Sequence, residues 1–424
     1  MMLSNITVPL LGLVDTAIIG HLSAAYYLGG VALGSTLFTL IVWLLGFLRM
    51  ATTGLTAQAF GAGNAHNQKA LLYQGLLLAV LLGSSLVLLH QPLLELVLSL
   101  SAASSEVLHY CREYFSVRIL SLPLTLANLV MLGWLLGRQS PRAAMWQLIL
   151  ANLVNIALDV LFVLGLGMGV KGAALASVLA DVAAFAVAAV FVRRALSHMK
   201  AAPIQLTGLF QGLGRLLRLN RDIFIRSLCL QLTFAFMNFK GAGIGDTTVA
   251  ANAVLLNFLL LVSYALDGIA YYGEAETGAA IGRRDGSALL GAVTLALGWS
   301  AMFALLFSAA FALGGDMLIQ LMTDISAVQE AALTCLPWLV LMPILAFGSY
   351  LFDGVYIGAT QGKVMRNSML LATFGVFLPV WFLSQQQGNH ALWLAMSAFM
   401  AARSLSLGWH FYRFHGRFIE QQTP

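Results

Sequence analysis

The stretch RRALSHMKAAPIQLTGLFQGLGRLLRLNRD, residues 193–222, is the longest hydrophilic interval in an otherwise strongly apolar chain. The 424 residues are 60% hydrophobic and 9% charged, against about 45–50% and about 25% in ordinary soluble domains. A soluble fold could not bury so much apolar surface. On both sides of the interval, apolar runs recur at about the 18-residue length that crosses some 30 Å of hydrocarbon as a helix. The chain is therefore expected to be an all-α polytopic membrane protein.

Twelve transmembrane helices are predicted, and the interval divides them into six and six. Their expected ranges are 3–20, 28–50, 70–91, 112–137, 143–166, 172–193, 222–241, 246–272, 287–313, 332–358, 366–384 and 389–411. The domain organisation expected from this pattern is an N-terminal six-helix lobe (1–192), a cytoplasmic inter-lobe linker (193–221), a C-terminal six-helix lobe (222–412) and a cytoplasmic tail (413–424).

The two halves share a register. An offset of 221 residues places FGAGN (60–64) on IGRRD (281–285) and GWLLG (133–137) on GVYIG (354–358). Glycine is abundant here, so each match alone is weak, but several matches at one offset indicate a duplicated six-helix unit. Six helices per unit give both units the same orientation, related by an axis along the membrane normal. This is the geometry of a secondary transporter.

The basic residues predict the orientation. Fifteen of the 22 lie in even-numbered loops or the C-terminal tail, and the odd-numbered loops hold two, Lys171 and Lys240. The positive-inside rule then places both termini in the cytoplasm. The remaining five lie at or within helix ends and do not enter this count: Arg49, Arg112, Arg118, Arg226 and Arg403. The basic residues are too dispersed for a nucleic-acid patch, so no nucleic-acid partner is expected.

No motif points to an enzyme. The nearest approach to a nucleotide-binding loop, GATQGK (358–363), has the wrong spacing and follows a membrane helix rather than a strand. No Ser-His-Asp arrangement or metal-ligand spacing can be argued, and Cys111, Cys229 and Cys335 occur singly, as small core residues do. We therefore expect no cofactor and no bound metal, and a transport step driven by an ion gradient.

Several carboxylates lie inside predicted spans. Asp15 interrupts GLVDTAIIG (12–20), and Asn152, Asn155 and Asp159 recur on one face of a single helix. An acid at the centre of a membrane helix costs about 2.5–3.5 kcal/mol on insertion scales, so it marks a function or a buried partner. We expect Asp15 and Asp159 to exchange protons near physiological pH. The alternative, an Asp that only fixes helix packing, carries more weight for the other three: Asp181, Asp267 and Asp353.

The motifs together resemble the multidrug and toxic compound extrusion (MATE) family, in its DinF (DNA-damage-inducible) branch. The matching segments include SNITVPLLGLVDTAIIGHL, FLRMATTGLTAQAFGAGN, NIALDVLFVLGLGMGVKGAALASV, YALDGIAYYGEAETGAAIGRRDGS and DGVYIGATQGKVMRNSM. The resemblance implies a V-shaped twelve-helix antiporter in a bacterial inner membrane, which expels cationic or amphipathic organic compounds in exchange for protons or sodium. It also implies an N-lobe cation site formed by Asp15, Asn155, Asp159 and Ser177.

Three further expectations complete this interpretation. Asp181, Asp267 and Asp353 are candidates for additional coupling or substrate contacts, and the protein is expected to be a monomer. Relatives carry a longer N-terminus with Leu-Pro early in the first helix, so either the coding sequence starts upstream of Met1 or Pro9 takes that role. The alternatives to proton coupling are a sodium-coupled exporter and a flippase for lipid-linked substrates, which would place several basic residues inside the cleft.

Overall fold

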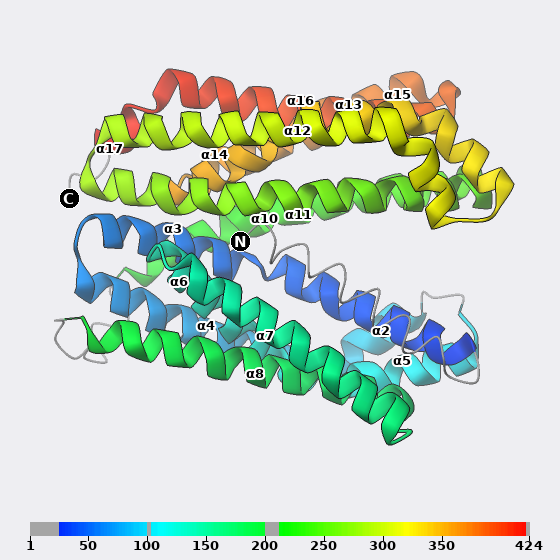
Figure 1. The fold of residues 1–424 in the computed structure, drawn as a ribbon, viewed down its shortest axis with the longest axis horizontal. Helices are drawn as coiled ribbons and strands as arrows, with labels where there is room; N and C mark the ends of the chain where they lie inside the picture. Colours follow the sequence, from blue (N-terminus) through cyan, green and yellow to red (C-terminus); the bar gives the residue numbers. More distant parts are fainter. Residues whose placement is uncertain (1–24, 100–102, 200–211, 421–424) are drawn as a thin grey trace. The chain divides into compact units, whose positions relative to one another are not determined.

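The computed structural model describes residues 25–99, 103–199 and 212–420 (Figure 1). These residues form helices and short connections and contain no β-strand. They divide into two compact units, one holding most of residues 25–216 and the other holding 217–420 together with 61–63. The predicted first span, 3–20, with Pro9 and Asp15, lies outside the described residues.

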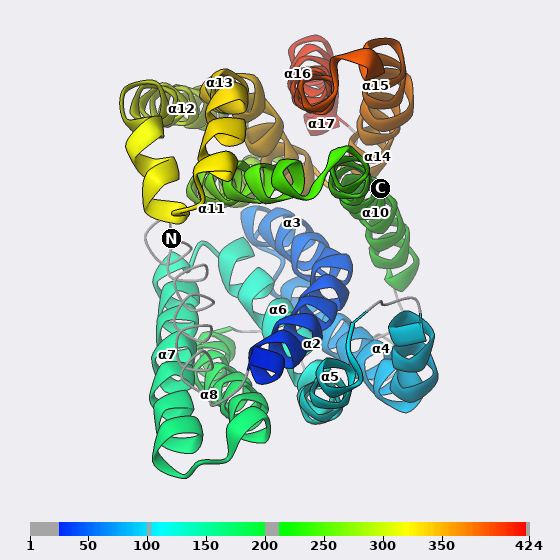
Figure 2. The same ribbon diagram turned by 90° about the vertical axis from the view of Figure 1, so that its right-hand side faces the viewer.

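The described part of the first unit contains seven α-helices, with a 3-10 turn (η1) before α6 and a π-helical segment (η2) after α7. The bounds are α2 Ala25–Leu44, α3 Phe47–Gly61, α4 Ala65–Ser99, α5 Ser105–Arg118, η1 Ile119–Ser121, α6 Leu122–Gly137, α7 Pro141–Asp159, η2 Val160–Gly165 and α8 Gly169–Ser197. Figures 1 and 2 both show α7 and α8 running side by side over most of their length.

The second unit contains the longest helices of the described chain, and a π-helical segment (η3) lies between α14 and α15. The bounds are α10 Leu213–Ile244, α11 Asp246–Arg283, α12 Gly286–Met322, α13 Ser326–Gly358, α14 Gly362–Leu370, η3 Leu371–Phe377, α15 Leu378–Ser384, η4 Gln385–Gln387, α16 Asn389–Phe414 and α17 Arg417–Glu420. Its core is rich in fully buried aromatic side chains, among them Phe377, Trp393 and Phe399.

Ten helical stretches of the described chain are long and apolar enough to cross a membrane. Each predicted span from 28–50 onward falls on a helical stretch of the structure. The predicted span 222–241 lies on α10, which is not among these ten stretches. This helix carries five charged side chains in its first half. Helix also enters the predicted linker from both ends, because α8 continues to Ser197 and α10 begins at Leu213.

Two glycines of α6 let it approach α3 closely in the first unit. A Cβ at Gly133 would lie 2.5 Å from the carbonyl oxygen of Arg49, and one at Gly137 would lie 2.6 Å from that of Thr53. Cβ atoms do not tolerate such distances, so only glycine fits at these positions unless the helices move apart. The small residues thus set the helix spacing, as is common in membrane bundles.

The second unit repeats this contact 221 positions later. A Cβ at Gly354 of α13 would clash with the carbonyl oxygen of Ala270 on α11, and one at Gly358 would clash with that of Glu274. The two glycines and the two residues that supply the carbonyl groups each lie 221 positions after their counterparts in the first unit. This is the offset that aligns GWLLG with GVYIG. The duplication therefore appears in three-dimensional packing as well as in sequence.

Candidate functional site

The polar face of α7 is buried at two successive turns. Asn155 and Asp159 are each 3% exposed and lie four positions apart, so they project from the same side of the helix. Asn152, three positions before Asn155, is half-buried. The α-helix ends at Asp159 and continues as the π-helical segment η2. Such π-helical segments inside helices occur frequently at functional sites.

A hydrogen bond connects this face to α8. The Nδ2 atom of Asn155 donates to the Oγ of Ser177 over 3.4 Å, and Ser177 is half-buried. Three of the four residues expected to form the cation site, Asn155, Asp159 and Ser177, therefore belong to two helices packed against each other. The fourth, Asp15, lies outside the described residues, and the role of the group stays a prediction.

Asp181 forms a half-buried ion pair within the first unit. Its Oδ2 accepts from Arg118 Nη1 at 2.6 Å, Thr125 Oγ1 at 2.6 Å and Ser121 Oγ at 3.0 Å. The guanidinium of Arg118 also lies over the ring of Phe38, 3.9 Å from its centroid. Charge-assisted bonds of this length are the strong ones, so this carboxylate has a fixed cationic partner.

Polar contacts continue from this ion pair across three helices. Asn128 Nδ2 of α6 donates to the backbone oxygen of Asp181 at 2.9 Å, and Gln147 Nε2 of α7 donates to the backbone oxygen of Asn128 at 3.3 Å. Asp181 follows Ser177 by four positions on α8, so the ion pair and the Asn155 contact share one side of that helix. The first unit thus contains a polar layer that joins α6, α7 and α8.

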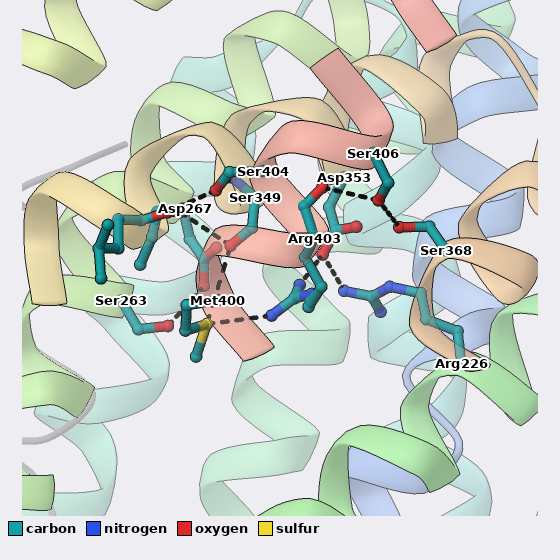
Figure 3. Close-up of polar contacts among 12 residues, drawn as sticks. Arg226, Ser263, Asp267, Ser349, Asp353, Ser368, Met400, Arg403, Ser404 and Ser406 are labelled. Carbon is teal, nitrogen blue, oxygen red and sulfur yellow. Dashed lines mark hydrogen bonds and ion pairs between the residues drawn. The ribbon is translucent and has the colours of Figure 1, made fainter. Parts of the chain in front are cut away.

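The second unit contains a different charged group (Figure 3). Arg226 of α10 and Arg403 of α16 both donate through Nη2 to the same oxygen, Oδ2 of Asp353 on α13, and the Arg403 bond is 2.7 Å long. The exposed fractions of Arg226, Asp353 and Arg403 are 6%, 7% and 2%. We call these three residues the C-unit charge cluster.

The charge cluster corrects one step of the sequence analysis. Arg118, Arg226 and Arg403 were set aside as residues at or within helix ends. Arg118 does end α5, but α10 and α16 extend well beyond Arg226 and Arg403 on both sides. Each of the three arginines is bonded to an aspartate of another helix. The signal available in the sequence was an arginine inside an apolar span, because such a residue is tolerated only with a buried partner.

Hydroxyl groups surround the charge cluster and tie α16 to its neighbours. The backbone N–H of Ser349 donates to Ser404 Oγ at 2.9 Å, and the hydroxyls of Ser368 and Ser406 lie 2.6 Å apart (Figure 3). The side chain of Ser349 in turn donates to the backbone oxygen of Ala346. The cluster is therefore held in a polar seam within an otherwise apolar unit.

Asp267 is the remaining candidate acid, beside Asp181 and Asp353. On α11 its Oδ2 accepts from the hydroxyl of Ser263, one turn earlier, at 3.5 Å. Asp181 and Asp353 are each bonded to arginine. Over the described residues, no group of three His, Cys, Asp or Glu side chains is gathered as metal ligands would be. The three cysteines are each buried, which confirms their interpretation as core residues.

With this geometry described, the chain can be compared with known proteins. The profile of the MatE family matches residues 1–161. A solved structure described as the outward-facing conformation of a multidrug resistance MATE family transporter of the MOP superfamily superimposes with a TM-score of 0.89 at 22% identity, covering 100% of this chain and 95% of that one. This likeness shows that the fold is that of a MATE transporter.

The curated relatives give the family. The DNA damage-inducible protein F of Escherichia coli (strain K12) is 48% identical over 408 residues, covering 96% of this chain and 89% of that protein. The multidrug export protein MepA of Staphylococcus aureus (strain NCTC 8325 / PS 47) is 22% identical over 392 residues, covering 90% and 84%. The chain belongs to the MATE family of multi-pass membrane transporters. Within that family it is a member of the DinF branch, which confirms the resemblance.

Proposed function

We propose that this chain is a secondary antiporter that exports cationic and amphipathic organic compounds in exchange for protons. Membership of the MATE family supports the transport class. Relatives named for multidrug export or multidrug resistance support the substrate class, MepA of Staphylococcus aureus and the probable multidrug resistance protein NorM of Caulobacter vibrioides, 31% identical over 302 residues, among them.

The observation that carries the proposal is the buried contact between α7 and α8. Asp159 shares its helix face with the amides of Asn155 and Asn152, and Asn155 bonds to the hydroxyl of Ser177. These amide and hydroxyl neighbours are neutral polar groups. In the proposed mechanism Asp159 and Asp15 carry the exchanged proton, and Asn155 and Ser177 orient the carboxyl groups.

An antiport cycle requires this site to be neutral in one access state and charged in the other. Only a group whose free energy differs between the two states lets a gradient shift their populations. One elementary charge moved through about 100 mV supplies about 2.3 kcal/mol, which changes a two-state ratio nearly fiftyfold. A single carboxyl that gains and loses a proton is therefore sufficient to drive the exchange.

The test uses Asp159→Asn and Asp15→Asn. Asn keeps the shape of a protonated carboxyl but cannot release a proton, so both variants should lose substrate-induced proton release from everted vesicles and still bind a cationic dye when purified. The matched control is Asp324→Asn, an exposed acid between α12 and α13. Retained proton release in Asp159→Asn would overturn the assignment of the coupling site.

Repeating the vesicle assay with and without sodium separates the two gradients. Carboxylate, amide and hydroxyl oxygens suit either ion, so the coupling ion has to be identified by removing one gradient at a time. Proton coupling predicts that dye-induced proton release is unaffected when sodium is omitted. Dependence on sodium in place of pH would favour the sodium-coupled alternative.

A flippase for lipid-linked substrates is the second candidate, and one observation favours it. Its expected mark was several basic residues inside the cleft, and the related observation is that Arg226 and Arg403 are buried within the second unit. A dithionite assay with a fluorescent anionic lipid in proteoliposomes tests it. Lipid scrambling or transport that depends on both arginines would support the flippase over the drug exporter.

The proposed location is a bacterial inner membrane, with a monomer as the unit and both termini in the cytoplasm. The loop charge bias carries this orientation. A C-terminal reporter active only in the cytoplasm is the expected result, and a reporter active only in the periplasm would reverse it.

A further inference from the structure

The charge cluster of the second unit is rich in donors and poor in acceptors. A guanidinium offers several N–H donors and no acceptor. Here the guanidinium groups of Arg226 and Arg403 share the single oxygen Oδ2 of Asp353. Within the part of the chain that the structure describes, the Nε atoms of Arg226 and Arg403 have no hydrogen-bond partner. Nη1 of Arg403 lies 3.4 Å from the sulfur of Met400, a weak acceptor.

Buried donors without acceptors lower the stability of the fold, so their presence here indicates a function. Buried charges need a well-matched partner and satisfied hydrogen bonds, and a partly satisfied network is less stable than an apolar core. The two arginines have more donors than the single oxygen of Asp353 can accept, and a carboxylate that offers both of its oxygens would satisfy more of them. Arginine is the side chain best suited to this, since its planar fork matches a carboxylate in two parallel bonds.

The surroundings fit a ligand that also has an apolar body. The guanidinium of Arg403 lies over the ring of Phe399, 5.4 Å from the ring centroid, and Phe399 belongs to the aromatic core of the unit. Asp353 lies on α13, which contains two prolines, Pro337 and Pro343, on its N-terminal side. Proline inside a helix removes a backbone hydrogen bond, which makes a tilt of the segment carrying Asp353 less costly.

We propose that Arg226 and Arg403 form a recognition site for the carboxylate of zwitterionic amphipathic substrates, and that Asp353 occupies this site as an internal carboxylate when no substrate is bound. When the substrate enters, its carboxylate replaces Asp353 Oδ2 on the two guanidinium groups, and no covalent bond changes. The export of such substrates rests on the proposed function, but their recognition by the two arginines can be measured on its own.

The experiment compares two dyes that differ at one group. Rhodamine 110 has a free carboxylate, and rhodamine 123 is its methyl ester with the same cationic ring system. Fluorescence polarisation gives the affinity of both dyes for the purified full-length protein. In Arg226→Lys and Arg403→Lys, which keep the charge and lose the fork, rhodamine 110 should bind about tenfold more weakly while rhodamine 123 changes by less than about twofold.

Asp353→Asn should act in the opposite direction. Removing the internal competitor should tighten rhodamine 110 by about tenfold and leave rhodamine 123 unchanged. If this variant is unstable, its thermal unfolding midpoint is measured instead, and rhodamine 110 should raise that midpoint more than rhodamine 123 does. The control is Arg366→Gln, which breaks the Arg366–Asp222 ion pair (2.8 Å) of the same unit and should not alter the ratio of the two affinities.

Equal changes for both dyes in the lysine variants, or unchanged rhodamine 110 binding, would overturn the proposal. Rhodamine 123 reports separately on the proposed function. If the wild-type protein binds rhodamine 110 through the arginines but neither binds nor exports rhodamine 123, the carboxylate site stands and export of organic cations fails.

Discussion

Arg118 Nη1 lies 2.6 Å from Asp181 Oδ2, a half-buried ion pair between residues 63 positions apart in the chain. It joins the end of α5 to the middle of α8, four positions after Ser177. The first unit therefore contains two candidate acids on the packed helices α7 and α8. Asp181 is bonded to the guanidinium of Arg118, and Asp159 shares its helix face with the amides of Asn152 and Asn155. We expect substitutions at the two acids to have different consequences.

Asp181→Asn should destabilise the protein without altering the pH dependence of transport. Removing the carboxylate costs about 1–3 kcal/mol, because the guanidinium of Arg118 stays half-buried without its charged acceptor. The free energy of unfolding, measured by denaturant titration of the purified protein, should fall by about this amount. Dye efflux per folded molecule should keep the wild-type pH profile.

The double variant Arg118→Gln/Asp181→Asn is the control for this interpretation. Because it removes both charges together, its loss of stability should be smaller than the sum of the two single losses. Strict additivity would mean that the two side chains do not stabilise each other. Loss of proton coupling in the stable double variant would move Asp181 into the coupling site.

The glycine contacts predict a matched set of stability changes. Gly137→Ala in α6 and Gly358→Ala in α13 should each destabilise by about 1–3 kcal/mol, because the added methyl group overpacks a helix contact that cannot open without moving backbone. Gly298→Ala in α12 is the control, since nothing lies within 4 Å of its Cβ and alanine favours a helix by up to about 1 kcal/mol. Thermal unfolding of purified variants measures all three.

The two clashing substitutions should have similar effects, because the glycines occupy equivalent places in the duplicated units. A large loss at Gly137 with none at Gly358 would show that the two contacts are not energetically equivalent. Destabilisation by Gly298→Ala as large as theirs would show that loss of glycine itself, and not the close contact, is responsible.

Asp285 predicts a pH dependence outside the membrane. It caps α12, where the backbone N–H of Ala288 (2.9 Å) and the hydroxyl of Ser287 (2.7 Å) donate to its carboxylate and hold its pKa below the ordinary value of 3.8. Because the folded pKa is the lower one, this stabilisation is complete above about pH 4 and is lost as the pH falls through the folded value. Thermal unfolding midpoints at pH values below 4 measure the loss.

Asp285→Asn is the comparison for this prediction. An Asn side chain still caps the helix but does not titrate, so the variant should lose less stability between about pH 5 and about pH 3 than the wild type does. Equal acid sensitivity of the two proteins would show that Asp285 contributes nothing to the pH dependence.

Features that depend on one helix at a time could be predicted from the sequence. Span positions follow from apolar length, and the shared face of Asn155 and Asp159 follows from the helical repeat. The ends of the helices were harder to predict. The span 28–50 was expected to end before Thr53 and Gln58, yet α3 continues to Gly61 because these polar residues are buried by packing against other helices.

Contacts between distant helices could not be predicted. Asp353 lies 127 positions from Arg226 and 50 from Arg403, so their pairing depends on how α10, α13 and α16 pack. Single-helix patterns contain no such information. The offset of 221 residues did not supply it either, because the positions equivalent to Asp353 and Arg403 in the first half are Leu132 and Val182. The duplicated glycines kept the packing, while the charged groups differ between the two units.

Ser177 offers the most direct test of the contact between α7 and α8. Ser177→Ala removes the hydroxyl that accepts from Asn155 Nδ2, a neutral hydrogen bond whose loss costs about 0.5–1.5 kcal/mol. If Asn155 and Ser177 orient the proton-carrying carboxyl, this loss should shift the pH midpoint of dye efflux by up to about one pH unit, since one unit corresponds to about 1.4 kcal/mol. Ser177→Thr keeps the hydroxyl and should retain the wild-type midpoint. Ser197→Ala removes a hydroxyl that bonds to the backbone oxygen of Arg194 at the end of the same helix, and it should change neither quantity. A midpoint that stays constant in Ser177→Ala, with stability reduced, would assign the Asn155–Ser177 bond to helix packing and leave Asp159 without this support.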